Sequence, residues 1–270
     1  MKRVLIAILL VTICQGANAD YKVYKLEKTA RIDDKGKCMD MDGNLLPGKA
    51  EAQKSLKDGR KIGTLCIDGE AIGARVYYKS GVLEAETPFK NGELEGVVKS
   101  FYESGILREE APYKNGIPDG IVKNYYENGK LKEEMPIKNG AVDGTAKTYY
   151  ENGKLMSEVA YKNDVRDGIV KLYYKSGKLN EEIPYKNDVE DGIAKTYYED
   201  GKLNAEVAYK DGSREGEMKR FRENGKIFSV FTYKNNKAIS GLCYKANGEK
   251  APFTKDELKT WDNGFKINCD

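Results

Sequence analysis

The sequence predicts an all-β fold, an elongated antiparallel meander of tandem 24-residue β-hairpin repeats with a short C-terminal helix. Glycine recurs every 24 residues, and the residues between the glycines alternate with the two-residue period of strands. One glycine series comprises Gly81, Gly105, Gly129, Gly153, Gly177, Gly201 and Gly225, and a second comprises Gly96, Gly120, Gly144, Gly168, Gly192 and Gly216. We therefore expect seven repeats over residues 74–241.

The first turn of each hairpin is predicted from the Asn128-Gly129 dipeptide, which lies between YYE and KL. This dipeptide favours a two-residue type I′ turn, because both central residues need a positive φ. Counting outward pairs Tyr126 with Leu131, Tyr125 with Lys132 and Lys123 with Glu134. Opposite charges recur at that last pair in other repeats, namely Arg75 with Glu86, Lys99 with Glu110, Lys147 with Glu158, Lys171 with Glu182 and Lys195 with Glu206. Cross-strand charge pairs of this kind support the register.

Strand alternation separates two faces of the predicted sheet. The buried face carries Val122, Tyr126, Leu131, Met135 and Ile137. The opposite face carries lysine, glutamate and one tyrosine per hairpin, and tyrosine offers a large rigid contact area with a polar end. We predict a binding face whose contact residues are Tyr77, Tyr125, Tyr149, Tyr173 and Tyr197. The alternative is that these tyrosines only cover the Lys–Glu pairs.

The second turn, Asn139–Gly144, links each hairpin to the next. Proline, which lacks an N–H donor, comes shortly before this turn in four repeats, at Pro88, Pro112, Pro136 and Pro184. The sheet should therefore be bulged or frayed near the second turn.

The two ends are less regular than the repeats, and an open sheet needs protected edges. Residues 20–73 are expected to form a degenerate N-terminal repeat and cap, and residues 242–270 a C-terminal cap. Thr254 and Glu257 have the spacing of a capping box ahead of Leu258. We predict a short helix here that packs Trp261 against the last hairpin.

Residues 1–19 have the order of a secretory signal peptide, with Lys2 and Arg3, the apolar run 4–13, and Ala17-Asn18-Ala19. Cleavage is expected between Ala19 and Asp20, giving a periplasmic, surface-bound or secreted protein. A membrane anchor is disfavoured because spanning a bilayer takes about 20 apolar residues. Lipidation of Cys14 is disfavoured by the bulky Ile13 before it.

Four cysteines then remain, Cys38, Cys66, Cys243 and Cys269, which allow three disulfide connectivities. Their grouping at the two ends favours Cys38 with Cys66 and Cys243 with Cys269. Unpaired thiols are the alternative, and the absence of a CxxC spacing disfavours a metal site.

Composition narrows the function. The 270 residues contain no histidine, which excludes Ser-His-Asp and Cys-His nucleophiles and His-ligated metals. The 46 basic and 43 acidic side chains nearly cancel, so nucleic acid is not an expected partner. The repeated glutamate column lacks the unique constellation of an active site, so we expect neither an enzyme nor a cofactor.

The segments YYENGKLKEE, YKNG and DG resemble the MORN repeat variant found in many bacterial proteins. The resemblance implies consecutive hairpins in an often single-layer sheet. Relatives of this kind are often labelled antitoxins or phosphoinositide kinases, but this chain has no kinase signature.

We expect an exported, non-enzymatic scaffold that binds a protein or a cell-surface glycan. The alternatives are an antitoxin or immunity protein of a toxin–antitoxin pair, a membrane-surface module, and a homodimer formed through the apolar face. The near-neutral charge gives little attraction to anionic lipid.

Overall fold

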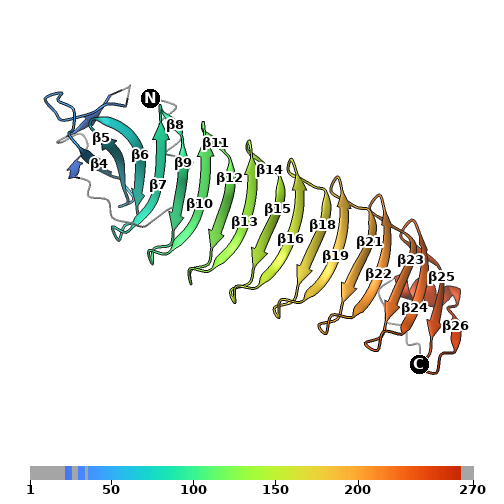
Figure 1. The fold of residues 1–270 in the computed structure, drawn as a ribbon. Coiled ribbons are helices and arrows are strands. Elements are labelled where there is room, and N and C mark those ends of the chain that lie inside the picture. Colours follow the sequence, from blue (N-terminus) through green and yellow to red (C-terminus); the bar gives the residue numbers. More distant parts are fainter. Residues whose placement is uncertain (1–21, 26–29, 34–35, 263–270) are drawn as a thin grey trace. The chain divides into compact units, whose positions relative to one another are not determined.

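The computed structural model describes residues 22–25, 30–33 and 36–262, arranged as two compact units that divide between Ala141 and Val142. Both units consist of antiparallel hairpins that follow one another in sequence order (Figure 1). The predicted all-β meander of 24-residue repeats is confirmed. The predicted leader, with its cleavage between Ala19 and Asp20, lies outside the described residues.

Unit 1 contains the N-terminal region and the first repeats. Its strands are β1 (Lys22–Lys25), β2 (Arg31–Ile32), β3 (Cys38–Met39), β4 (Lys49–Ser55), β5 (Lys61–Ile67), β6 (Glu70–Tyr77), β7 (Leu83–Lys90), β8 (Glu93–Leu94), β9 (Gly96–Phe101), β10 (Leu107–Lys114), β11 (Ile117–Pro118), β12 (Gly120–Tyr125) and β13 (Leu131–Lys138). Among the described strands, β1 departs from the predicted antiparallel pattern because it pairs in parallel with β4.

Unit 2 contains the later repeats and the only helix that the described residues form. After β14 (Ala141–Val142) its elements are β15 (Gly144–Tyr149), β16 (Leu155–Lys162), β17 (Val165–Arg166), β18 (Gly168–Tyr173), β19 (Leu179–Lys186), β20 (Val189–Glu190), β21 (Gly192–Tyr197), β22 (Leu203–Lys210), β23 (Ser213–Phe221), β24 (Ile227–Lys234), β25 (Lys237–Tyr244), β26 (Lys250–Pro252) and α2 (Lys255–Asp262).

The first turn is not the predicted type I′ turn. The Gly129 N–H donates to the Tyr126 carbonyl at 2.8 Å, and the Tyr126 N–H donates to the Lys130 carbonyl at 2.8 Å. Of Asn128 and Gly129, only Gly129 has a positive φ, of 79°. The connection is thus a three-residue loop in which a type I turn precedes a glycine bulge.

This extra loop residue changes the register close to the turn. Tyr125 pairs with Leu131, so the predicted pairings of Tyr125 with Lys132 and of Tyr126 with Leu131 are wrong. A bulge between Asn124 and Tyr125 then shifts the register back by one residue. The predicted pair of Lys123 with Glu134 is therefore confirmed, because the two irregularities offset each other.

Type I′ geometry occurs instead at the second turn. Asn187 and Asp188 have φ values of 50° and 65°, and they form a two-residue loop between Lys186 and Val189. The predicted bulge near this turn is confirmed by Gly192, whose φ of 124° is reserved for glycine. A Cβ atom at Gly192 would also lie 2.8 Å from the Pro184 side chain. Glycines of the second series are thus fixed by their backbone conformation and by a close approach to the preceding strand, to proline at Gly96, Gly120 and Gly192 and to alanine at Gly168 and Gly216.

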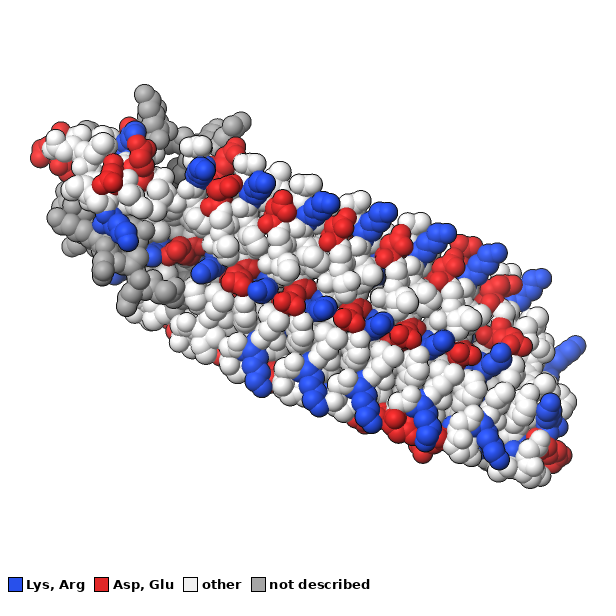
Figure 2. All heavy atoms as spheres, in the orientation of Figure 1, with Lys and Arg blue, Asp and Glu red and all other residues white. Residues whose placement is uncertain are grey.

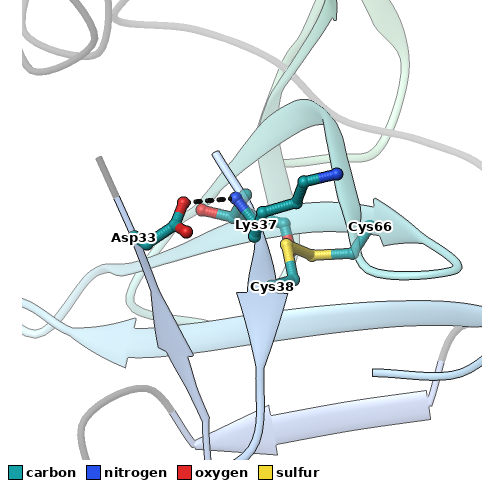
Figure 3. Close-up of a disulfide and its surroundings, with 5 residues drawn as sticks. Asp33, Lys37, Cys38 and Cys66 are labelled. Carbon is teal, nitrogen blue, oxygen red and sulfur yellow. Dashed lines mark hydrogen bonds between the residues drawn. A yellow bond between two sulfur atoms is a disulfide. The ribbon is translucent and has the colours of Figure 1, made fainter. Parts of the chain in front are cut away.

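The N-terminal region of unit 1 has a small hydrophobic core. Its buried members are Ala30, Cys38, Leu46, Ala50, Ala52 and Cys66. Cys38 in β3 and Cys66 in β5 form the predicted disulfide, with the Lys37 N–H donating to Asp33 beside it (Figure 3). The disulfide ties the short β2–β3 sheet to the long strands.

The C-terminal region of unit 2 has a second core. The predicted capping box is confirmed, with the Thr254 N–H donating to Glu257 at 2.7 Å and the Glu257 N–H donating to Thr254 Oγ1 at 3.3 Å. Leu258 of α2 is buried with Phe231 and Tyr233. The Trp261 side chain and Cys269 lie outside the described residues, so their predicted contacts stay predictions; Cys243 is disulfide-bonded.

Candidate functional site

A charge ladder runs across the strands on one face of each unit, which we call the ladder face. In unit 1 its members are Arg75, Glu86, Lys99, Glu110, Lys123 and Glu134, each paired across a strand boundary with the next. In unit 2 they are Lys147, Glu158, Lys171, Glu182, Lys195, Glu206 and Lys219. Basic and acidic side chains alternate in such rows in Figure 2.

The ladder is made of moderate ion pairs. Their N–O distances are 3.5 Å for Lys123–Glu110, 3.7 Å for Lys147–Glu158, 3.8 Å for Lys171–Glu182 and 3.9 Å for Lys195–Glu206. Each carboxylate also has a lysine on its other side, so positive and negative charges alternate along the row. This arrangement fixes the side chains but leaves no net field to attract a charged partner.

The predicted contact tyrosines lie on the ladder face, and the structure gives them an internal role. The hydroxyls of Tyr125, Tyr173 and Tyr197 donate to Glu110, Glu158 and Glu182 of the preceding repeat, at 2.9, 2.8 and 2.9 Å. Tyr77 donates instead to the buried Glu51. Tyr149 occupies the equivalent place in β15 and is half-buried like the other four.

These contacts hold the tyrosine hydroxyls protonated. Burial, followed by the hydrogen bond to glutamate, raises the pKa of Tyr125, Tyr173 and Tyr197 to about 12. Burial likewise raises the pKa of Tyr77. The hydroxyls are donors to the protein itself, which leaves the ring surfaces for a partner; that such a partner binds them stays a prediction.

Sequence reasoning missed a row of aliphatic residues beside the ladder, in which exposed Val or Ile side chains alternate with half-buried Pro or Ala side chains; we call this row the aliphatic band. In unit 1 it consists of the cross-strand pairs Val97–Pro112 and Ile121–Pro136, and in unit 2 of Ile169–Pro184 and Ile193–Ala208. The side chains of Ile169 and Ile193 are 50% and 56% exposed. Strand alternation could have identified these exposed residues, because Ile169 is two residues before Lys171 and therefore shares its face.

A second charged row borders the band on the side of the second turn. Lys162, Lys186 and Lys210 are exposed, and strand alternation places Lys186 on the face of Pro184 and Glu182. The Asp191 N–H donates to the Pro184 carbonyl at 3.0 Å, and the Asp167 N–H donates to the Ala160 carbonyl at 3.1 Å. In unit 2 the band lies between the ladder and the row of exposed lysines Lys162, Lys186 and Lys210, and uncharged atoms separate rows of charge in Figure 2.

The opposite face is better buried but also contains carboxylates. Val170, Ala194 and Ala205 are at most 8% exposed. Burial raises the pKa of Glu109, near Glu133, and of Glu181, near Glu190.

Within the described residues no group of three or more His, Cys, Asp and Glu side chains is placed to hold a metal ion. No helix in that part of the chain is both long and apolar enough to cross a membrane.

A search of curated proteins found no match. Among solved structures, the chain is similar to part of one titled "Structure of Photorhabdus luminescens Tc holotoxin pore, Mutation TccC3-D651A", with 12% sequence identity and a TM-score of 0.17. The match covers 77% of this chain and 14% of that chain, so this chain spans only a small part of the protein it matches.

The family model of the MORN repeat variant matches seven segments, at residues 74–91, 94–115, 118–139, 142–163, 166–187, 190–211 and 214–235. These segments make a repeat scaffold of the same hairpins that carry the charge ladder. Because they cover more than half of its residues, the chain belongs to the MORN repeat variant family.

Proposed function

We propose that the protein is an exported, non-enzymatic scaffold that binds a protein partner through the ladder face. The observation that carries this proposal is the aliphatic band. Ile169 and Ile193 are half exposed although they lie in central strands of a regular sheet. Contiguous exposed apolar side chains with a polar rim are typical of protein-binding surfaces.

The tyrosines and the ladder support the same surface. Tyr173 and Tyr197 are fixed by their hydrogen bonds to Glu158 and Glu182, so little side-chain entropy remains to be lost on binding. Their rings add apolar area on the other side of the ladder from the band. A partner would therefore contact a rigid surface.

The proposed export has two supports. The first is the signal-peptide pattern of residues 1–19. The second is the Cys38–Cys66 disulfide, because disulfides form and persist in oxidising compartments outside the cytosol.

Site-specific photo-cross-linking of the mature protein tests this function. A photoreactive phenylalanine derivative is placed at Ile193, and at Ile239 as a matched control, since Ile239 is 58% exposed but lies outside the band in β25. Irradiation in envelope extract should give a discrete protein adduct at Ile193 that mass spectrometry identifies. Equal labelling at both positions would contradict the proposal, as would adducts that contain only glycan.

A pair of substitutions gives a second readout. Thr145 replaces isoleucine at the equivalent place of β15 and pairs with Ala160 there, so the fold accepts threonine. The I169T/I193T variant should keep the circular dichroism spectrum and lose most of the adduct formed from a reactive group at Tyr173. Full retention of that adduct would place the partner elsewhere.

A further inference from the structure

We infer that the element recognised by the aliphatic band of unit 2 is an amphipathic α-helix with a heptad pattern, lying across the strands. The inference rests on the proposed function and narrows it to one class of partner. Three features of the ladder face carry it: the spacing of the band, its charged borders and its length.

The spacing of the band matches that of a heptad. Ile169 and Ile193 lie in β18 and β21, which are two strand positions apart in the sheet because β19 lies between them. Two steps of about 4.8 Å separate them by about 9.6 Å. Seven residues of an α-helix rise about 10.5 Å, so one apolar residue per heptad meets one isoleucine per repeat.

An extended peptide does not match this spacing. Side chains on one face of a strand recur every two residues, or about 6.8 Å, which falls out of step with the isoleucines within one repeat. The backbone groups of the central strands are also bonded to their neighbours on both sides, so the band offers no sheet edge for strand addition.

The charged borders match the flanks of such a helix. On one side of the band lie Lys171, Glu182 and Lys195 of the ladder, and on the other lies the exposed Lys186. Heptad helices carry lysine and glutamate beside the apolar seam, where they pair with charges of the opposite sign.

The length of the band sets the length of the helix. Together with the equivalent Thr145–Ala160 pair next to it, the band forms a row that crosses six strands of unit 2, from β15 to β22, or about 24 Å between the outer two. A helix of about 16 residues covers this distance. Three heptads, about 21 residues, therefore cover this six-strand row with a short overhang.

The probe that tests this inference is a labelled synthetic peptide of three heptads. It carries leucine and alanine at the two seam positions and lysine and glutamate beside them, because a full leucine seam would favour self-association. Titration of the full mature chain should raise the fluorescence anisotropy of the peptide and increase its helical circular dichroism signal. A control peptide of the same composition has its leucines spaced five residues apart.

Variants of the protein then locate the contact. I169T/I193T should weaken binding at least about tenfold, and I239T should leave it within about twofold. Affinity should fall as salt rises, because the charged borders are exposed and screened. Three results would each contradict the inference that the partner is a helix. These are equal binding of the two peptides, equal effects of I169T/I193T and I239T, and binding without a gain in helicity.

The outcomes separate this inference from the proposed function. Cross-linking at Ile193 can capture a protein whose cross-linked segment is not helical, while neither peptide binds. In that case the inference of a helical partner is wrong, and the proposal that the ladder face binds a protein is retained. If position 193 captures nothing more than position 239, the binding face fails as well.

Discussion

The C-terminal region of unit 2 and the repeats that precede it are built from the same hairpins but held together differently. In the C-terminal region Phe231 is 1% exposed, stacks on Phe253 with ring centroids 4.9 Å apart, and contacts the α2 residue Leu258. In the repeats of β15–β22 the most buried apolar side chains are small, such as Val170 and Ala194. One region is stabilised by a packed core, and the other by many small contacts repeated across strands.

This difference follows from the repetitive architecture. A repeat in the middle of an array is covered by a neighbour on each side, so ladders and turn-to-turn hydrogen bonds suffice. The Asp188 N–H, for example, donates to the Arg166 carbonyl of the previous second turn at 3.0 Å. A terminal repeat lacks one neighbour and needs another element over its edge. Changes in the ends should therefore have large single effects, and changes in the repeats small ones.

The largest effect is expected for F231A. It removes a ring from the core formed with Phe253 and Leu258, and buried phenylalanine-to-alanine changes reduce stability by about 3–5 kcal/mol. Denaturant unfolding followed by circular dichroism measures the loss. F228A in the same strand is the matched control, because the Phe228 ring is half-buried beside Arg222. Equal losses for the two variants would show that α2 and its core contribute nothing special.

The disulfide at the other end ranks next. C38S/C66S opens a cross-link between residues that are 28 positions apart, which corresponds to about 3–4 kcal/mol of chain entropy. The variant and the parent are compared under oxidising conditions, so that Cys243 stays in its own disulfide. A loss below about 1 kcal/mol would mean that the small core around Leu46 holds the N-terminal region without the cross-link.

An intermediate effect is expected from a glycine of the second series. Gly168 has a φ of 129°, and a Cβ there would lie 2.8 Å from the Ala160 Cβ, so G168A should reduce stability by about 1–3 kcal/mol. A160G should recover part of the loss in the double variant by removing the clash. G153A is the control, because Gly153 has open space around its Cβ position and a milder φ of 86°. If G153A is as harmful as G168A, the close approach to β16 is unimportant.

These glycines also show what the sequence can and cannot predict. Their 24-residue spacing predicts the hairpin array, and the charge pattern predicts the Lys123–Glu134 pair. The type of the first turn was predicted wrongly, because Asn128-Gly129 is the same dipeptide as Asn139-Gly140 of the second turn. Glycine fits both a type I′ turn and the bulge that follows a type I turn, so loop length and strand twist decide between them.

The candidate site was predicted only in part, for a related reason. Strand alternation places Tyr173 and Lys171 on one face, but it does not predict that the Tyr173 hydroxyl donates to Glu158 in the preceding repeat. A bulge lies between Leu172 and Tyr173, and strand alternation alone does not predict where a side chain points next to a bulge. Ile169 was missed because apolar residues in strands are expected to be buried, whereas a single sheet layer leaves one face uncovered.

The smallest effect is expected from the tyrosine hydroxyls of the ladder face, and it should appear only at alkaline pH. Burial and the bonds to glutamate raise the pKa of Tyr173 and Tyr197 to about 12 in the folded protein, against about 10 in the unfolded chain. A pKa raised by folding means that the folded state holds the proton more tightly. The stabilisation is therefore complete below pH 10 and is lost as the pH rises to about 12.

The variant Y173F/Y197F isolates this contribution. Lysines also deprotonate in that pH range, so the informative quantity is the difference between the parent and the variant in the free energy of unfolding. The parent should lose stability more steeply than the variant between about pH 10 and 12. Tyrosinate absorbance should also develop at higher pH in the folded parent than in the unfolded chain. Parallel pH profiles would mean that the hydroxyls contribute nothing to the ladder, and that the tyrosines are present for their rings alone.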